Sequence, residues 1–289
     1  MSICFYLFNR FYYHYNFSLD QFLVNMRNLS GSWYILLIIC SVLNWGLESY
    51  KWKFLVNRLE ALPYKDAVKS VLSGVAVSQL LPYRTGEYLG RLAYISDRNK
   101  AGATALSIFG SYSQLLITLL PGFFGFYKFT GLVSSTYIFM LGFPVLLAVL
   151  LAAYFILPRY KQFKHTKIGV ALNLLRPKDM VMLLGFSLIR YLTFMIPYAM
   201  LAQHYDSVGN MELAHYAGCV MAIYFMQTVA PNFILTDVAL RLTLPVAVFH
   251  FNGRSAGLEY VPGMLIYIFN VVIPMCVGAV ILMLARIRR

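Results

Sequence analysis

The chain has 289 residues, of which 60% are hydrophobic and only 12% are charged, and its mean hydropathy is +0.66. This composition excludes an ordinary soluble domain, because too few polar side chains remain to cover a surface in contact with water. It predicts an all-α integral membrane protein with a single polytopic domain over residues 1–289. The formal net charge of +13 does not indicate nucleic-acid binding, since the basic residues are concentrated in short segments between apolar runs.

The N-terminal segment, residues 1–28, is rich in Phe and Tyr and also contains Arg10 and His14. This mixture suits the headgroup region of a bilayer, so we expect either an interfacial helix or a short first span. Residues 33–127 form the first predicted repeat, and its first span is apolar except for Glu48. We expect Glu48 at the membrane surface, paired with Lys51 or Lys53.

Residues 71–81 form an apolar run of eleven residues that is too short to cross a bilayer, which requires roughly 20 residues. Pro82 ends this run, and the charged residues that follow it would be costly in lipid. Residues 65–96 are therefore predicted to form a re-entrant hairpin that enters and leaves the membrane on one side. Residues 101–127 carry no charge and return the chain across the membrane.

Residues 133–157 are predicted to form a linking span. Residues 158–178 contain six Lys or Arg residues and no acid, so the loop 158–179 is placed in the cytoplasm. Residues 180–285 form the second predicted repeat, with a hairpin over residues 213–250. The last span ends in a basic segment, which places the C-terminus in the cytoplasm.

The linking span inverts the second repeat relative to the first. Each repeat then consists of a span, a re-entrant hairpin and a span, an architecture that many secondary transporters use for alternating access. The four cysteines are far apart in apolar segments, and we expect them to be small core residues. Neither a metal site nor a cofactor is expected.

A short polar pattern occurs in both predicted hairpins. In each, a glutamine and an apolar pair precede a proline, and a carboxylate follows four residues before an arginine. A proline at a hairpin apex leaves the first N–H groups of the next arm unpaired, which favours an anion there. We expect a phosphate-bearing lipid headgroup to bind between the hairpins, with Arg84, Glu87, Arg91, Arg190, Asp237 and Arg241 as binding residues.

Other residues are expected to support this site, with Thr85 and Thr236 as caps of the hairpin arms. The supporting residues are Gln79, Pro82, Thr85, Gln114, Gln227, Pro231 and Thr236. An alternative role is open for the charged residues: the carboxylate and arginine of each hairpin can neutralise each other as pairs four residues apart. Arg190 can equally have a structural role, and the side-chain amides of the three glutamines can be interhelical hydrogen-bond partners.

Three segments resemble the flippase-like membrane family that includes the transmembrane domain of lysylphosphatidylglycerol synthases. They are LNWGLESYKWKFL (residues 43–55), LLPYRTGEYLGR (residues 80–91) and the proline-led stretch 227–241, and the resemblance extends over most of residues 30–285. The second hairpin departs from the family pattern, because residues 232–235 contain no glycine and Asp237 takes the place of glutamate. The resemblance implies the lipid-translocating part without the synthase domain.

The function expected on these grounds is a lipid flippase or scramblase in a bacterial inner (plasma) membrane, a transporter rather than an enzyme. It would move a phospholipid or polyprenyl-linked lipid, and no Walker A motif is present to couple it directly to ATP. One alternative is a membrane-embedded transferase that acts on a lipid-phosphate sugar, with Glu87 or Asp237 as base. Another is an assembly subunit for a partner enzyme. The sequence also leaves open that the protein forms a homo-oligomer.

Overall fold

The structure, a computed structural model, describes residues 19–79, 81, 85–129, 137–159, 166–206, 212–230, 234–252 and 258–287. These residues form helices and connecting turns, without a β-strand among them. The α-helices are α2 (Leu19–Asn28), α3 (Gly31–Val56), α4 (Tyr64–Ser78), α5 (Gly86–Leu92), α6 (Lys100–Phe129), α7 (Tyr137–Ile156), α8 (Lys167–Asn173), α9 (Pro177–Tyr205), α10 (Leu213–Val229), α11 (Ile234–Phe251), α12 (Tyr260–Tyr267) and α13 (Ile273–Ile287).

Among the described residues, five helical segments are long and apolar enough to cross a membrane. They comprise α3, α6 with the turn before it, most of α7 with the turn after it, α9, and the continuous segment from α12 through α13. Their outer faces carry large apolar side chains that remain exposed, such as Val42 on α3 and Val145 on α7. An outward apolar surface of this kind suits lipid rather than water. The predicted all-α integral membrane class is confirmed.

The two central helices, α3 and α9, run antiparallel and are joined at both ends. At one end, Arg58 beyond α3 pairs with Asp179 in the first turn of α9 at 2.8 Å. At the other end, the rings of Trp33 and His204 lie 5.3 Å apart. Asp179 also accepts a hydrogen bond from the backbone N–H of Arg176 at 2.9 Å, which caps the start of α9.

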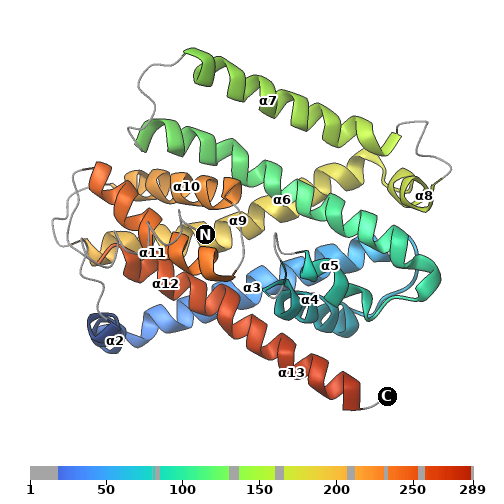
Figure 1. Cartoon of the computed structure of the whole chain (residues 1–289), viewed down its shortest axis with the longest axis horizontal. Helices are drawn as coiled ribbons and strands as arrows, with labels where there is room; N and C mark the ends of the chain where they lie inside the picture. Colours follow the sequence, from blue (N-terminus) through green and yellow to red (C-terminus); the bar gives the residue numbers. More distant parts are fainter. Residues whose placement is uncertain are drawn as a thin grey trace.

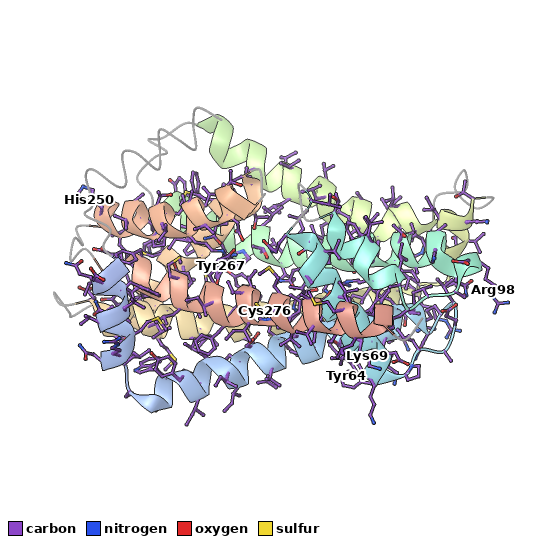
Figure 2. All side chains as sticks on the ribbon, turned by 60° about the horizontal axis from the view of Figure 1, so that its bottom comes forward. Tyr64, Lys69, Arg98, His250, Tyr267 and Cys276 are labelled. Carbon is purple, nitrogen blue, oxygen red and sulfur yellow. The ribbon has the colours of Figure 1, made fainter. Side chains whose placement is uncertain are left out.

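Two pairs of shorter helices lie at opposite ends of this central pair. Helices α4 and α5 are at one end and α10 and α11 at the other (Figure 1). The same separation is visible in Figure 2, where Tyr64 and Lys69 of α4 lie at the opposite end from His250 of α11. The last span passes between the two ends, through Tyr267 and Cys276.

Each short helix pair packs against a span from the other half of the chain. Helix α4 lies against α13, where a Cβ on Gly278 would overlap the carbonyl of Leu72. Helix α10 lies against α6, where a Cβ on Gly125 would come within 2.6 Å of the carbonyl of Gly218. Glycines allow both backbones to approach this closely, as small residues do between membrane helices. The packing of the two halves is thus reciprocal.

The structure departs from the sequence predictions in two elements of this framework. The last span is not a regular α-helix, because a π-helical turn, Ile268–Val272, interrupts it. The predicted core position of the cysteines is wrong for Cys276, which is exposed on the apolar outer surface, whereas Cys219 is buried. Residues 1–18, most of the predicted N-terminal segment, lie outside the described residues, as do Pro82, Arg84 and Pro231.

Candidate functional site

A cavity of about 210 Å³ lies among the central helices and both short helix pairs. Its lining includes four charged side chains, namely Glu87 of α5, Arg190 of α9, and Asp237 and Arg241 of α11. Three predicted supporting residues, Gln79, Gln114 and Gln227, also line it. The fold therefore brings seven of the predicted residues, from both halves of the chain, to one cavity.

Glycines set the position of Glu87 by allowing α4 and α5 to pack closely. A Cβ on Gly90 would lie 2.5 Å from the carbonyl oxygen of Ser73, and one on Gly86 would overlap that of Val77. On α4, a Cβ on Gly74 would lie 2.7 Å from the carbonyl oxygen of Glu87. The Gly-x-x-x-Gly spacing of α5 thus presents a flat face to α4, as it does between membrane helices. This contact directs Glu87 to the cavity.

Arg91 is buried next to Glu87 and is not among the residues that line the cavity, and its side chain is 2% exposed. Its Nη2 contacts both Glu87, one turn earlier, and Oε1 of Glu48 on α3 at 2.7 Å. The guanidinium also lies over the ring of Trp52, 5.3 Å from its centroid. Arg91 does not line the cavity, so the structure assigns it contacts with carboxylates rather than with the cavity.

Glu48 was expected at the membrane surface, and this expectation is wrong because the carboxylate is enclosed by three helices. Its pair with Lys51 is present at 2.9 Å, but the Glu48 side chain is only 4% exposed. Arg91 and Arg190 approach the same carboxylate, and these three cations compensate for the loss of hydration that burial imposes on it.

Arg190 is presented to the cavity by three residues of one α3 segment. Its Nη1 donates to Oε2 of Glu48 at 2.5 Å and its Nε donates to Oδ1 of Asn44 at 2.7 Å. Its guanidinium lies 5.5 Å from the ring centroid of Trp45. These contacts leave Arg190 both anchored and on the cavity wall. The two roles weighed from the sequence, structural and ligand-binding, are compatible in this geometry.

The second half contributes a pair of the same spacing. Nε of Arg241 donates to Oδ1 of Asp237 at 3.2 Å, and its guanidinium lies 4.7 Å from the ring centroid of Tyr267. Both ion pairs that the sequence left open as an alternative, Glu87 with Arg91 and Asp237 with Arg241, are therefore formed. They differ in their arginine, because Arg241 lines the cavity and Arg91 does not.

Several buried polar atoms on the cavity wall have no hydrogen-bond partner among the described residues. They are Nε2 of Gln79, both amide atoms of Gln114, the hydroxyl of Tyr224 and Nδ2 of Asn270. Buried polar groups are normally paired, and an orphaned group at a cavity indicates water or a ligand as its partner. All but one of these atoms are hydrogen-bond donors, which complements the two arginines.

The π-helical turn places Asn270 on this wall. A π-helix leaves backbone carbonyls with altered partners, and here α3 supplies donors to them. Ser41 Oγ donates to the carbonyl of Phe269 at 2.7 Å, and Trp45 Nε1 donates to that of Asn270 at 3.0 Å. The Asn270 side chain also accepts from Asn44 Nδ2 at 3.2 Å. The two asparagines are therefore interhelical hydrogen-bond partners.

The two threonines do not cap the hairpin arms as predicted. Thr85 is the N-cap residue of α5, but its side chain makes no capping hydrogen bond because its backbone is already helical, with φ −60° and ψ −25°. Thr236 lies inside the first turn of α11, which begins at Ile234, and it is buried.

Sequence reasoning also missed Glu48, Tyr224 and Asn270 as parts of the site. For Glu48, the available signal was a lone acid in an apolar span.

The helices and the charged interior define a polytopic membrane protein with a polar internal cavity. The chain belongs to the family of the lysylphosphatidylglycerol synthase transmembrane region, whose model matches residues 2–231. This family connects it with lipid modification or lipid flipping. The chain matches no curated protein and no solved structure. The matched range contains Glu48, Glu87, Arg91 and Arg190 and ends before Asp237, so the resemblance seen in the sequence is confirmed as far as residue 231.

Proposed function

We propose that this protein is a flippase or scramblase that moves a phosphate-bearing lipid across the membrane. The headgroup passes through the cavity while the hydrocarbon tails stay in the bilayer. The observation that carries the proposal is the cavity wall, where Arg190 of α9 and Arg241 of α11 line one space together with buried hydrogen-bond donors. Guanidinium groups bind phosphate oxygens through strong charge-assisted hydrogen bonds.

The balance of charge around the cavity supports an anionic ligand. Among the described residues, the carboxylates of Glu48, Glu87 and Asp237 face four cations, Lys51, Arg91, Arg190 and Arg241. The carboxylates orient the arginines and offset the cost of placing them inside a membrane protein. The cavity wall itself holds two of these carboxylates and two of the arginines, and the one positive charge in excess belongs to the buried network behind it. A phosphate monoanion would balance that charge.

The reciprocal packing of the two halves supports the inverted-repeat architecture and alternating access. In this proposal, the α4–α5 and α10–α11 pairs are re-entrant hairpins that enter from opposite sides of the membrane, in keeping with their positions at opposite ends of the fold (Figure 1). Each hairpin lies against the last span of the other repeat, so movement of one repeat changes access from both sides. The headgroup site between them remains central.

The distribution of basic residues supports a cytoplasmic position for the end that carries α4 and the C-terminal helix. Lys69 and Arg98 lie at this end, and α13 leads toward it (Figure 2). Helix α8, which begins at Lys167, lies at this end too (Figure 1), while Asp206 at the end of α9 and Glu212 at the start of α10 are acidic. The positive-inside rule then orients the protein in a bacterial inner membrane.

Reconstitution in vesicles tests the proposal directly. The purified protein is placed in vesicles of phosphatidylcholine and phosphatidylglycerol that contain fluorescent phosphatidylglycerol, and lipid movement is followed by dithionite quenching. We expect movement without chemical change of the lipid. A new lipid product by mass spectrometry would instead support the transferase, and neither movement nor product would contradict a transport function and favour an assembly subunit.

Charge variants link the movement to the cavity. Arg190→Gln and Arg241→Gln are expected to slow lipid movement, because each removes a guanidinium from the cavity wall. Arg58→Gln is the matched control, since Arg58 also pairs with a buried carboxylate, Asp179, but does not line the cavity. Equal rates for the two cavity variants and the control would remove the cavity from the proposed pathway.

A further inference from the structure

Glu48 of α3 connects three cations that belong to three different helices. Its Oε1 accepts from Arg91 of α5 at 2.7 Å, and its Oε2 contacts Lys51 of α3 at 2.9 Å and Arg190 of α9 at 2.5 Å. Glu48 does not line the cavity, so the proposed function leaves it without a direct contact to the lipid headgroup. Its contacts nevertheless join the first hairpin to the central helices.

The ion pairs form a chain whose two ends face the same cavity. Glu87 lines the cavity and contacts Arg91, Arg91 contacts Glu48, Glu48 contacts Arg190, and Arg190 again lines the cavity. In the middle of this series of ion pairs, two carboxylates share one nitrogen, because Nη2 of Arg91 contacts both Glu87 and Glu48. A cation shared by two carboxylates shifts toward the one that is less neutralised by its other neighbours.

We propose that Glu48 is a positioning residue. Through Glu48, binding of a phosphate at Arg190 weakens the ion pair that stabilises the first hairpin, α4–α5. This inference rests on the proposed function. A phosphate at Arg190 competes with Glu48 for the guanidinium, and Glu48 then attracts Arg91 more strongly. Arg91 in turn binds Glu87 less strongly, which weakens the ion pair inside α5. The hairpin becomes easier to rearrange when a headgroup is present, which is the condition that alternating access requires.

This role makes a different prediction from a purely structural one. Glu48→Gln keeps the size of the side chain and removes the charge that competes with the ligand. Binding of an anion at Arg190 should therefore become tighter, by roughly tenfold for the loss of one nearby negative charge. Lipid movement should slow at the same time, by roughly tenfold, because phosphate binding at Arg190 then no longer weakens the ion pair in the hairpin. Loss of a structural residue would weaken both.

The test measures the two quantities separately in full-length protein. Binding of glycerol phosphate, the water-soluble part of a phospholipid headgroup, is measured in detergent by calorimetry and by thermal stabilisation. Movement of fluorescent phosphatidylglycerol is measured in vesicles of phosphatidylcholine and phosphatidylglycerol. Asp179→Asn is the matched control, because it also removes a buried carboxylate that pairs with an arginine, and it should leave glycerol phosphate affinity and lipid movement at the wild-type level.

The outcomes separate the inference from the proposed function. Parallel loss of binding and movement in Glu48→Gln, or no change in either, would overturn the coupling while transport by the wild type stands. Failure of the wild type to bind glycerol phosphate and to move lipid would overturn both. If Glu48→Gln does not fold, the double variant Glu48→Gln/Lys51→Met removes the cation with the carboxylate and is expected to show the same division between tighter binding and slower movement.

Discussion

Arg91 and Glu48 form an ion pair of 2.7 Å although 43 positions separate them in the sequence. The pair joins the short helix α5 to the long helix α3, and both side chains are almost fully buried. Such a pair in the interior is costly to break, because either partner alone keeps a charge that water cannot reach.

Arg91→Gln is expected to destabilise the protein strongly, because it leaves two carboxylates, Glu48 and Glu87, without their shared cation. The expected loss in the free energy of unfolding is about 3 to 5 kcal/mol. Lys69→Gln, which removes a cation from an exposed pair with Asp66, should cost no more than about 1 kcal/mol. Denaturant unfolding in detergent measures both, and similar losses would show that Arg91 is not an essential charge partner.

Gly86→Ala tests the close contact between α4 and α5. The new methyl group would overlap the backbone carbonyl of Val77, which cannot move without displacing the helix, so we expect a loss of about 1 to 3 kcal/mol and slower lipid movement. Gly185→Ala is the matched control, because no atom lies within 4 Å of its added Cβ. The control should be unchanged or slightly more stable. Tolerance of Gly86→Ala would contradict the packing.

Gln114→Leu should separate stability from function. Both amide atoms of Gln114 are buried without a protein partner in the described structure, so an apolar side chain of similar size removes an unsatisfied group. We expect an unfolding free energy that is unchanged or higher by about 1 kcal/mol, together with slower lipid movement. Thermal unfolding and the vesicle assay measure the two effects. A faster rate would show that the amide does not contact the headgroup.

Cysteine labelling tests the proposed re-entrant path of the first hairpin. Asp66 lies in the first turn of α4, Asp97 follows α5, and both are exposed. Single cysteines at these two positions should react with an impermeant maleimide from the same side of the membrane. A cysteine at Glu212 should react from the opposite side. The background carries serine at the native cysteine positions. Labelling of positions 66 and 97 from different sides would show that this segment crosses the membrane completely.

Glu60 predicts a pH dependence outside the spans. Partial burial raises its pKa, but hydrogen bonds from Ser96 and Asn99 outweigh this effect and lower the pKa below its usual value of 4.5. A lowered carboxylate pKa stabilises the folded state above the unfolded-state value, and this stabilisation is lost as the pH falls through the folded-state pKa. The melting temperature of the wild type should therefore fall more steeply below about pH 4.5 than that of Glu60→Gln. Parallel curves would contradict this contribution.

Much of the framework was predictable because it depends on local composition. Long apolar segments, a short run ending at residue 81 and a basic loop between residues 158 and 178 are properties of consecutive residues, and hydrophobic length alone indicates which segments can span a bilayer. The family resemblance of residues 43–55 and 80–91 could also be recognised without a structure. The interruption of the last span was not predicted, because Asn270 lies in an apolar segment that gives no local sign of a π-helical turn.

The sequence by itself determined the membrane class, the long helical segments and the four charged residues that line the cavity. The tertiary structure decided which of those charges meet. The local sequence predicts that Glu48 pairs with a nearby lysine such as Lys51. Only the packing of α5 and α9 against α3 brings Arg91 and Arg190 to its carboxylate. The physical reason is that an ion pair depends on distance in space, and close packing at glycines such as Gly86 and Gly90 sets that distance.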